Sequence, residues 1–394
     1  MEQGVLLSPP AGPWAHPPLS PPDLTPSRPR YDGKLSEIYA IYLRHLVLML
    51  VTLGWSRFWG RTRIRRYLWS HMAIFGDRLE YRGRGIELMI GFVLVLLVLA
   101  GWGGAIWLVV KFAFDDKWPA HFGLLDAFYF SVVVIGIPLS FVGQYAGLRY
   151  KLSRTRWRAI RWSLAGSAWR YGGLATFLTF ANAVTAQLLT PVVSVNLARP
   201  RLANVGLGSE RFEFAGQAGD IYGRYVGYYF LNLLAWIVAL AILVFAVFAG
   251  GSKLGLSGKE VLELFSTFSF RTVLLAVAAA FVFYLLFSLM ILPLRCWWQA
   301  YLLRYLVSHT RFRHVLFASS ISTRQMWGFL VLNYLIVILS LGLGWPWVIH
   351  RTLKLIASEL WIYGAPEGAR IQQSQVRVPR FGEGLLDMFD VTGI

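Results

Sequence analysis

A short pattern that occurs more than once is the feature that most constrains how this chain folds. Each clear copy closes an apolar run with Thr or Ser, Leu and Gly in succession, followed by a pair that contains Trp and then by an Arg. The copies are Thr52-Leu53-Gly54 with Phe58-Trp59 and Arg63, and Ser340-Leu341-Gly342 with Pro346-Trp347 and Arg351. A weaker copy sets Thr185 and Pro191 at the same spacing. Because repetition of sequence reflects repetition of structure, we expect a fold built from duplicated units.

The composition predicts that this duplicated fold lies in a membrane. The chain of 394 residues is 56% hydrophobic and 15% charged, with a mean hydropathy of +0.53, which is too apolar for an ordinary soluble domain. Seven apolar runs lie near residues 38–58, 88–110, 127–147, 172–198, 226–251, 272–294 and 326–349. A helix that spans a bilayer needs roughly 20 apolar residues, so we expect a repeated transmembrane domain over residues 31–364.

The first run and the two ends of the chain depart from this description. Only twelve uncharged residues separate Arg44 from Arg57, a length that is typical of a re-entrant or interfacial segment. Nine of the 17 prolines fall in residues 1–30, which predicts a disordered N-terminal tail rather than a signal peptide. Residues 365–394 are expected to form a cytoplasmic C-terminal tail.

The net charge of +18 is concentrated in loops that border the apolar runs. Basic residues gather in residues 57–84 and 149–170, whereas the loops around residues 115–117 and 253–263 are nearly balanced. Positive residues in short loops mark the cytoplasmic side of a membrane, so the two basic loops are expected inside. This placement disfavours nucleic-acid binding and leaves attraction to anionic lipid headgroups as a second interpretation of the arginines.

Simple alternation of seven crossings conflicts with the charge rule. It would place the basic stretch of residues 199–224 outside, and basic segments flank both the first and the last run on each side. The conflict disappears if the three runs with the repeated pattern enter and leave the cytoplasmic leaflet while the other four span. Both termini would then be cytoplasmic. Full crossing by some or all of the repeated runs is the alternative.

Residues that break helices lie inside the repeated pattern. Pro191 and Pro346 each lack a backbone donor and clash with the preceding helical turn, and Gly54 and Gly342 relax the chain nearby. We expect the helices to break or kink at these four positions. Irregular backbone at membrane depth is tolerated only where protein or water satisfies it, so the breaks either face a protein interior or vestibule, or serve packing alone.

A second repeated module precedes several helices. It consists of an aromatic residue, a variable residue and Gly, with an acidic residue four positions after the Gly. The copies are Tyr31-Asp32-Gly33 with Glu37, Tyr81-Arg82-Gly83 with Glu87, and Phe214-Ala215-Gly216 with Asp220. An acid near a helix N-terminus is favoured by roughly 0.3 to 1 kcal/mol, so helices are expected to begin there. The alternating residues 78–81 and 211–214 predict short strands, and hence small cytoplasmic β-hairpins on an otherwise all-α, polytopic helical bundle.

Several of these segments together resemble the YjgN family of bacterial inner-membrane proteins, which is grouped as a domain of unknown function. The resemblance rests on residues 52–67, on Ser153 to Arg161 and on the tail from Gly382 to Asp390, in the family's order. It covers roughly residue 31 to the C-terminus and implies a multi-pass inner-membrane protein with no established activity. The family tends to place Asn seven residues before the Thr of the pattern, where this chain has His45 and, in the later copy, Asn333.

The sequence favours non-enzymatic function. It contains no phosphate-loop, dinucleotide-binding, metalloprotease or serine-hydrolase motif, and its histidines form no metal-ligand spacing. We therefore expect no catalytic residue, metal or cofactor. Transport or translocation of a solute or lipid is one class that fits, because Gly- and Pro-interrupted repeats build the sites of many carriers. A membrane-organising scaffold that binds anionic lipid through its basic loops is the other.

The candidate contacts for lipid or ligand are basic, imidazole or amide side chains near the membrane boundaries. Two of them, His71 and His309, are the last residues of a further repeated segment, in which residues 66–71 match residues 304–309. The candidates are Arg61, Arg63, Arg65, Arg66, His71, Arg154, Arg156, Arg158, Arg161, Arg304, His309 and Asn333. The expected partners are membrane lipids, and the sequence does not indicate a protein partner.

Overall fold

The computed structural model describes residues 26–113, 124–253, 270–364, 371–374 and 376. Within these residues the chain forms ten α-helices and twelve short strands. The expectation of a helical fold with short β segments is therefore confirmed in part: the chain is mostly helical, but its strands join into two antiparallel sheets, so the fold is not all-α. The chain divides into two compact units: Met1–Ala218, Arg304–Ser320 and Asn333–Ile394 form the first, and Gly219–Leu303 with Ile321–Leu332 forms the second.

All the described strands belong to the first unit, and they pair antiparallel in two sheets. The five-stranded sheet has the order β1 (Pro26–Ser27), β12 (Leu360–Tyr363), β11 (Val315–Ser319), β10 (Thr310–Phe312) and β9 (Glu213–Phe214). The seven-stranded sheet has the order β2 (Arg30–Tyr31), β3 (Met72–Ile74), β4 (Asp77–Tyr81), β5 (Thr155–Trp157), β6 (Ile160–Leu164), β7 (Val205–Leu207) and β8 (Glu210–Arg211). Apart from the pairing of β1 with β12, neighbours in a sheet are also neighbours in the chain.

The two sheets are continuous with each other at both ends. Only Arg28-Pro29 separates β1 from β2, and only Phe212 separates β8 from β9. The order of hydrogen-bonded strands therefore returns to its starting point. The Phe212 ring lies 5.7 Å from that of Trp162 in one sheet and 4.8 Å from that of Phe312 in the other. We call this closed circuit of strands the strand ring.

An apolar core stabilises the strand ring. Its buried members are Trp157 and Leu207 from the seven-stranded sheet, and Phe312, Val315 and Ile362 from the five-stranded sheet. Residues of both sheets thus share one cluster, which is what a closed or sandwiched arrangement of short strands requires. Closure also explains how strands of two to five residues persist, since few of their backbone groups face an open edge.

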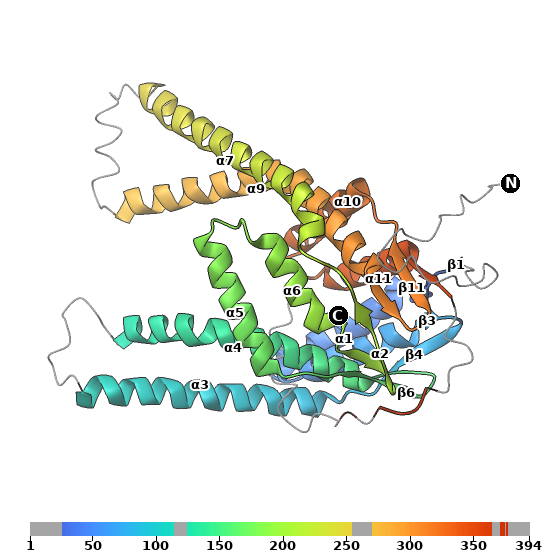
Figure 1. The fold of residues 1–394 in the computed structure, drawn as a ribbon. Coiled ribbons are helices and arrows are strands. Elements are labelled where there is room, and N and C mark those ends of the chain that lie inside the picture. Colours follow the sequence, from blue (N-terminus) through green and yellow to red (C-terminus); the bar gives the residue numbers. More distant parts are fainter. Residues whose placement is uncertain (1–25, 114–123, 254–269, 365–370, 375, 377–394) are drawn as a thin grey trace. The chain divides into compact units, whose positions relative to one another are not determined.

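The chain leaves the strand ring five times and returns each time through a pair of helices. Three pairs are short: α1 (Leu35–Val51) with α2 (Arg57–Ser70), α5 (Ala168–Val184) with α6 (Thr190–Leu202), and α10 (Thr323–Leu339) with α11 (Trp345–Glu359). Two pairs are long: α3 (Gly85–Ala113) with α4 (Leu124–Arg154), and α7 (Gly219–Lys253) with α9 (Phe270–Ser308). Short and long pairs alternate along the chain, and Figure 1 shows α3 and α4 extending away from the strands of the first unit.

Antiparallel pairing gives the strand ring two different rims. Successive strands alternate in direction, and helix pairs alternate with tight turns at 75–76, 158–159, 208–209 and 313–314. Strand ends that lead into helices therefore share one rim, which we call the helix rim, and the tight turns share the other, the turn rim.

The three short pairs have the same helix–turn–helix backbone. The first helix has 17 residues in every copy, and five residues separate it from the second helix. Each break contains two successive residues with positive φ, Leu53-Gly54, Ala186-Gln187 and Leu341-Gly342. In every copy the amide of the second of these residues donates to the carbonyl five residues earlier, a hydrogen bond that commonly ends a helix. The repeat in sequence is thus a repeated helix–turn–helix.

The breaks do not lie at the prolines, which corrects the sequence-based interpretation. Pro191 and Pro346 stand in the first turn of α6 and α11, where a helix has no partner for the missing N–H and the fixed φ of Pro is favourable. Gly54 and Gly342, with φ of 92° and 88°, lie at the break itself. Each short pair is therefore two helices joined by a turn rather than one kinked helix.

The aromatic-x-Gly module links a strand to a helix. In each copy the aromatic ring folds over the Gly two residues later, so that a Cβ there would lie 2.4 to 2.5 Å from a ring or hydroxyl atom of Tyr31, Tyr81 or Phe214. Only Gly leaves room for this ring. The predicted acids Glu37, Glu87 and Asp220 stand in the first turns of α1, α3 and α7, and the strands expected at 78–81 and 211–214 are β4 and the β8–β9 segment.

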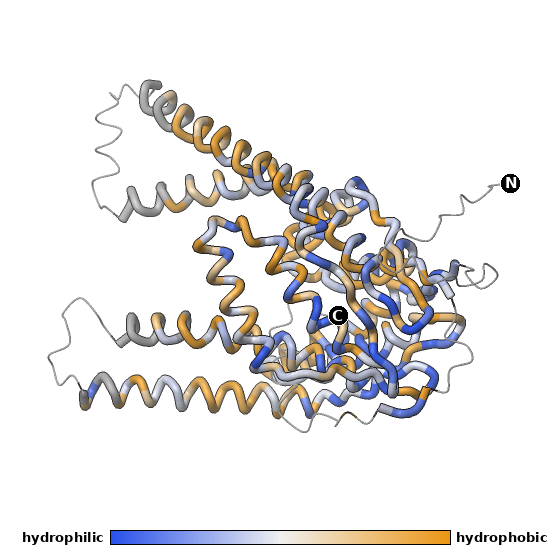
Figure 2. The backbone as a smooth tube through the Cα atoms, in the orientation of Figure 1, coloured by the Kyte–Doolittle hydropathy of each residue, from blue (hydrophilic) through white to orange (hydrophobic). Residues whose placement is uncertain are grey.

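Two helices among the described residues have the length and hydropathy of a membrane span. Gly85–Leu108 of α3 and Gly219–Phe245 of α7 have mean hydropathies of 2.4 and 2.2, and only 11% and 6% of their most apolar stretches are buried within the protein. Figure 2 shows the hydrophobic residues continuing along both helices. The spans expected near 127–147 and 272–294 fall in α4 and α9, whereas the loops expected outside, at 115–117 and 254–263, lie beyond the described residues.

The strand ring begins before the predicted end of the N-terminal tail. Pro26 pairs with Tyr363 and Ser27 with Ile362, so residues 26–30 belong to the ring rather than to the tail, and residues 1–25 lie outside the described part. The start of the C-terminal tail also contacts the ring. The amide of Ser209, in one of the tight turns of the turn rim, donates to the Gln372 carbonyl at 2.9 Å.

Substitution of the break glycines tests where the hairpins turn. Gly54→Ala and Gly342→Ala place a side chain at φ near 90°, and we expect each to lower the free energy of unfolding by about 1 kcal/mol or more. Pro191→Ala is expected to cost less, since only unfolded-state entropy is lost. Gly101→Ala, in open space on α3, is the control. Thermal unfolding in detergent measures the stability of all four variants. A larger loss of stability for Pro191→Ala than for the glycine variants would show that the helix breaks at the proline.

Candidate functional site

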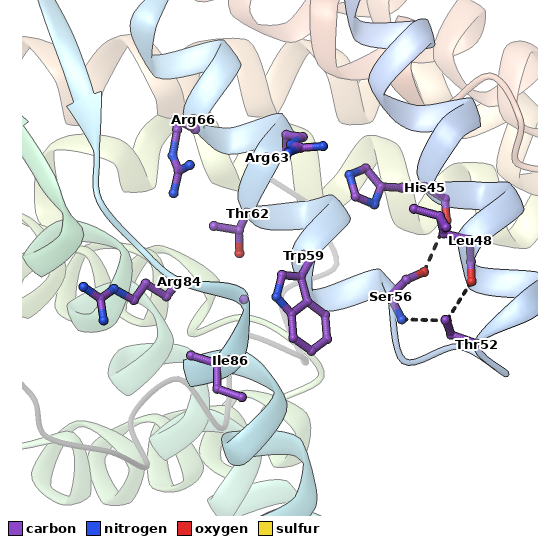
Figure 3. A pocket seen from close by; sticks show the side chains of 11 residues that line it. His45, Leu48, Thr52, Ser56, Trp59, Thr62, Arg63, Arg66, Arg84 and Ile86 are labelled. Atoms are coloured by element: carbon purple, nitrogen blue, oxygen red, sulfur yellow. Dashed lines mark hydrogen bonds between the residues drawn. The ribbon is translucent and has the colours of Figure 1, made fainter.

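A pocket of about 580 Å³ lies between the first short pair and the start of α3, within the first unit. It is lined by His45 and Leu48 from α1, by Thr52 and Ser56 from the break, by Trp59, Thr62, Arg63 and Arg66 from α2, and by Arg84, Gly85 and Ile86 at the start of α3. Figure 3 shows the α1 and break residues on one side of Trp59 and the arginines of α2 and α3 around its other sides. This pocket is the candidate site.

Two glycines bring the three helices together at the pocket. A Cβ on Gly60 would lie 3.0 Å from the Cβ of His45, and a Cβ on Gly85 would lie 2.9 Å from the Cα of Trp59. The small residues therefore allow α1 to approach α2, and α3 to begin against the backbone of α2. The pocket is thus a product of the repeated hairpin and of the module that starts the next helix.

The pocket is electropositive. Three guanidinium groups, those of Arg63, Arg66 and Arg84, line it, and no acidic residue does. Arg66 donates to the carbonyl of Gly83 at 3.3 Å. Among the residues that the structure describes, the side chains of Arg63 and Arg84 form neither an ion pair nor a hydrogen bond. An anion is the ligand that such a cluster of donors accommodates.

The other polar groups of the pocket are engaged by the backbone. Thr52 Oγ1 donates to the Leu48 carbonyl at 2.7 Å and accepts from the Ser56 amide at 3.0 Å. Thr62 Oγ1 donates to the Phe58 carbonyl at 2.9 Å. These hydroxyls hold the break and α2 in place, so the arginines are the main donors for a ligand. The His45 ring, whose two nitrogens are shielded from solvent and unpaired within the described structure, faces Arg63 (Figure 3).

The three short pairs differ in the residues that correspond to His45 and Arg63. In the third short pair the residues that correspond to His45 and Arg63 are Asn333 and Arg351, and the Arg351 Nη1 donates to Asn333 Oδ1 at 2.7 Å. Asn333 is only 9% exposed, so it braces the two helices of that hairpin. In the second pair Leu178, 8% exposed, stands at the Asn position. One arginine is braced while its counterpart Arg63 faces a pocket.

The remaining arginines of the first predicted cluster separate. Arg61 is exposed on α2, whereas Arg65 is 1% exposed and among the largest fully buried side chains. A buried arginine contributes to the structure rather than to a headgroup surface. The first cluster therefore places Arg63 and Arg66 at the pocket, leaves Arg61 on the surface and keeps Arg65 inside.

The second predicted cluster is engaged by the strand ring and its surroundings. Arg154 pairs with Glu87 at 3.0 Å and Arg158 with Asp77 at 2.5 Å. Arg161 donates to the carbonyls of Ser374, at 3.0 Å, and of Val376. Burial, and then the charges of Arg156 and Arg154, lower the pKa of Arg161. Arg156, half-buried in β5, lies opposite Glu80 and Arg161 in the register.

The repeated segment that ends in a histidine has a structural role. His71 stacks on Tyr67 with ring centroids 4.1 Å apart, and His309 stacks on Tyr305 at 3.9 Å. Each Tyr hydroxyl then contacts the residue after the module's Gly: the Lys34 amide donates to Tyr67 at 2.8 Å and the Gln217 amide donates to Tyr305 at 2.7 Å. The repeated segment thus fastens a helix end to the start of another element. Arg304 precedes Tyr305 in α9 and is not among the residues that line the pocket.

Sequence reasoning included Arg63 and Arg66 among its candidates but missed Arg84 and treated His45 only as a departure from the family pattern. The signals were present, because Arg84 follows the Gly of the second module and His45 stands where the later copy has Asn. The sequence does not show that α3 begins against α2, and this contact is what brings Arg84 and His45 to the same pocket. Within the described residues, no group of three His, Cys, Asp or Glu side chains could hold a metal ion.

In the part of the chain that the structure describes, the fold is mostly helical, with two antiparallel sheets and two apolar helices long enough to cross a membrane. The chain belongs to the family described as bacterial protein of unknown function DUF898, the YjgN family, whose model it matches over residues 26–388. The resemblance seen in the sequence is thereby confirmed. No curated protein and no solved structure matched the chain.

Asn333 offers a test of the brace. Asn333→Leu copies the second hairpin and removes the hydrogen bond from Arg351, so we expect the free energy of unfolding to fall by about 1.5 to 3 kcal/mol. Asn333→Asp keeps an acceptor and should cost much less. Thermal unfolding of the two variants in the same detergent gives the comparison, and equal stability of Asn333→Leu and wild type would show that the hydrogen bond does not brace the hairpin.

Proposed function

We propose that this protein is a multi-pass protein of the bacterial inner membrane that moves a lipid or another amphiphilic solute without covalent chemistry. The observation that carries the proposal is the pocket itself. It combines unpaired arginines with the apolar side chains of Leu48, Trp59 and Ile86, which is the pairing that an amphiphile presents. The pocket lies between a short helix pair and a long helix, and many carriers likewise have their binding sites at broken helices.

The distribution of apolar surface supports the membrane location. The helices α3 and α7 expose most of their apolar stretches, and such surfaces are uncommon on soluble monomers. The tips of two short hairpins expose Leu53 and Leu341 at 91% and 93%, both with φ of 50°. A leucine in this conformation costs about 1 kcal/mol or more, and contact with lipid gives the exposed side chain a favourable environment.

The lengths of the helices support partial insertion of the short pairs. A 17-residue helix extends about 25 Å, less than the roughly 30 Å of the hydrocarbon core, and α2 carries Arg57 at its first residue. The 29 residues of α3 and 35 residues of α7 exceed that thickness. With the strand ring on the cytoplasmic side, the basic loops and both described ends of the chain follow the positive-inside rule.

A scaffold that organises anionic lipid is the second candidate. The exposed Arg61 and the arginines of the pocket support it, since a basic surface near the headgroups attracts anionic lipid without any transport. Lipid binding is common to both candidates. Movement of the lipid across the bilayer distinguishes them.

Cysteine labelling tests the depth of the short pairs. In a Cys296→Ser background, cysteines at Leu53 and at Lys117, in the expected external loop, are exposed to a membrane-impermeant thiol reagent in intact spheroplasts. We expect Lys117→Cys to label and Leu53→Cys to stay unlabelled, because the hairpin tip stops within the bilayer. Ser209→Cys at the turn rim should label only after permeabilisation. Labelling of Leu53→Cys in intact cells would mean that the first short pair crosses.

A translocation assay separates the two candidate functions. The purified protein is reconstituted into vesicles that contain a fluorescent phosphatidylglycerol, and dithionite is added to quench the outer leaflet. A translocating protein makes the inner-leaflet label accessible, so the protected signal falls below that of protein-free vesicles. A scaffold leaves the protected signal unchanged. Vesicles that exclude a soluble fluorescent dye throughout provide the control against leakage.

A further inference from the structure

We propose that the pocket between α1, α2 and α3 binds the phosphate group of an anionic membrane lipid, with Arg63 and Arg84 as its principal donors and Arg66 as a third. This inference rests on the proposed membrane function and names the chemistry that its site recognises. The acyl chains of the lipid would leave along the exposed apolar side chains at the pocket, those of Leu48, Trp59 and Ile86, which are 39% to 42% exposed.

The charge of the pocket selects a phosphate. Guanidinium groups match the geometry of phosphate oxygens and donate two hydrogen bonds each, and three of them converge here with no acid among the lining residues. The side chains of all three arginines are exposed at the pocket, so an anion can reach them, and an anion that they share reduces the repulsion between their like charges. The cavity of about 580 Å³ has the size of a small-molecule site.

The location selects a lipid. The pocket begins at the break that presents Leu53, which is 91% exposed, and Trp55, which is 45% exposed. It continues to Arg84, which follows the strand ring and precedes α3. The apolar tip and the basic inner end thus lie in the order in which acyl chains and headgroups occur in a leaflet. Trp59 lies between Ser56 of the break and Arg84 (Figure 3), in keeping with the preference of Trp for membrane interfaces.

The third short hairpin supplies an internal control. Arg351 occupies the position of Arg63 in the repeat, but its guanidinium is bonded to Asn333. An arginine that already has an oxygen acceptor contributes less to an external phosphate. His45 replaces that acceptor in the first hairpin and forms no such hydrogen bond in the described structure. The two copies therefore differ in whether the arginine has an acceptor within its hairpin.

Native mass spectrometry of the full-length protein in mild detergent tests the proposal, with dioleoyl phosphatidylglycerol as the probe and dioleoyl phosphatidylcholine as the neutral comparison. We expect wild type to retain phosphatidylglycerol preferentially. Arg63→Gln should weaken its binding about tenfold, as the loss of a charge-assisted hydrogen bond implies, and Arg63→Gln with Arg84→Gln should weaken it further. Arg351→Gln, which removes the same charge in the third hairpin, should leave retention unchanged.

His45→Asn provides a test that keeps every arginine. The new amide can accept from Arg63 as Asn333 accepts from Arg351, so phosphatidylglycerol retention should fall while folding is preserved. Arg63→Lys keeps the charge but cannot form a bidentate hydrogen bond, so this variant should bind phosphatidylglycerol with intermediate affinity. Monodisperse elution and an unchanged unfolding temperature verify that each variant is folded. Equal loss of lipid in Arg351→Gln and Arg63→Gln would overturn the site, as would full retention in Arg63→Gln with Arg84→Gln.

Inorganic phosphate distinguishes the source of the phosphate group. A lipid site keeps its phosphatidylglycerol when millimolar phosphate is added, because phosphate lacks the apolar contacts. Displacement of the lipid by phosphate, together with equal retention of the two lipids in its absence, would overturn the lipid assignment. Retention and translocation are separate measurements. A protein that retains phosphatidylglycerol through Arg63 but moves none refutes only the transport function, whereas Arg63-independent retention with active translocation refutes only this site.

Discussion

Closed antiparallel pairing of short strands is the constraint on which the rest of the first unit depends. The strands are too short to form a stable sheet alone, and they persist because the ring shares one apolar core that includes Trp157, Phe312 and Ile362. Every helix pair joins two neighbouring strands of this ring. The strands before and after a helix pair are therefore hydrogen-bonded neighbours, whether the pair is short or long.

The three short hairpins share one backbone geometry and differ in the side chains between their helices. The turn has the same hydrogen bond and the same pair of positive φ angles in each copy. The position that faces the second helix carries His45 in the first copy, Leu178 in the second and Asn333 in the third. The repeated turn thus fixes the geometry, while the side chains at two positions differ. Asn333 accepts a hydrogen bond from Arg351, His45 accepts none from Arg63, and Asn196 takes the place of the arginine in the second copy.

The sequence predicted features with a local cause and missed those that depend on distant contacts. The hairpin breaks, the acids at helix starts and the strand at 78–81 all follow from short patterns, and the structure contains them. The prolines were misplaced by one helical turn because Pro occurs both at breaks and at helix starts. The pairing of Pro26 with Tyr363 has no local signal, and neither does the burial of Arg65. Of the site, Arg63 and Arg66 were found, while Arg84 required knowledge of where α3 begins.

The contact between the two ends of the ring has a consequence for biosynthesis. The strand β12 lies between β1 and β11, so both of those strands keep an unpaired edge until residues 360–363 have left the ribosome. The four earlier helix pairs are synthesised before that moment, because synthesis proceeds from the N-terminus. Closure of the ring therefore comes last, and the nascent chain carries exposed strand edges of the kind that favour pairing with other chains. Release of the C-terminal residues converts this open intermediate into the finished protein.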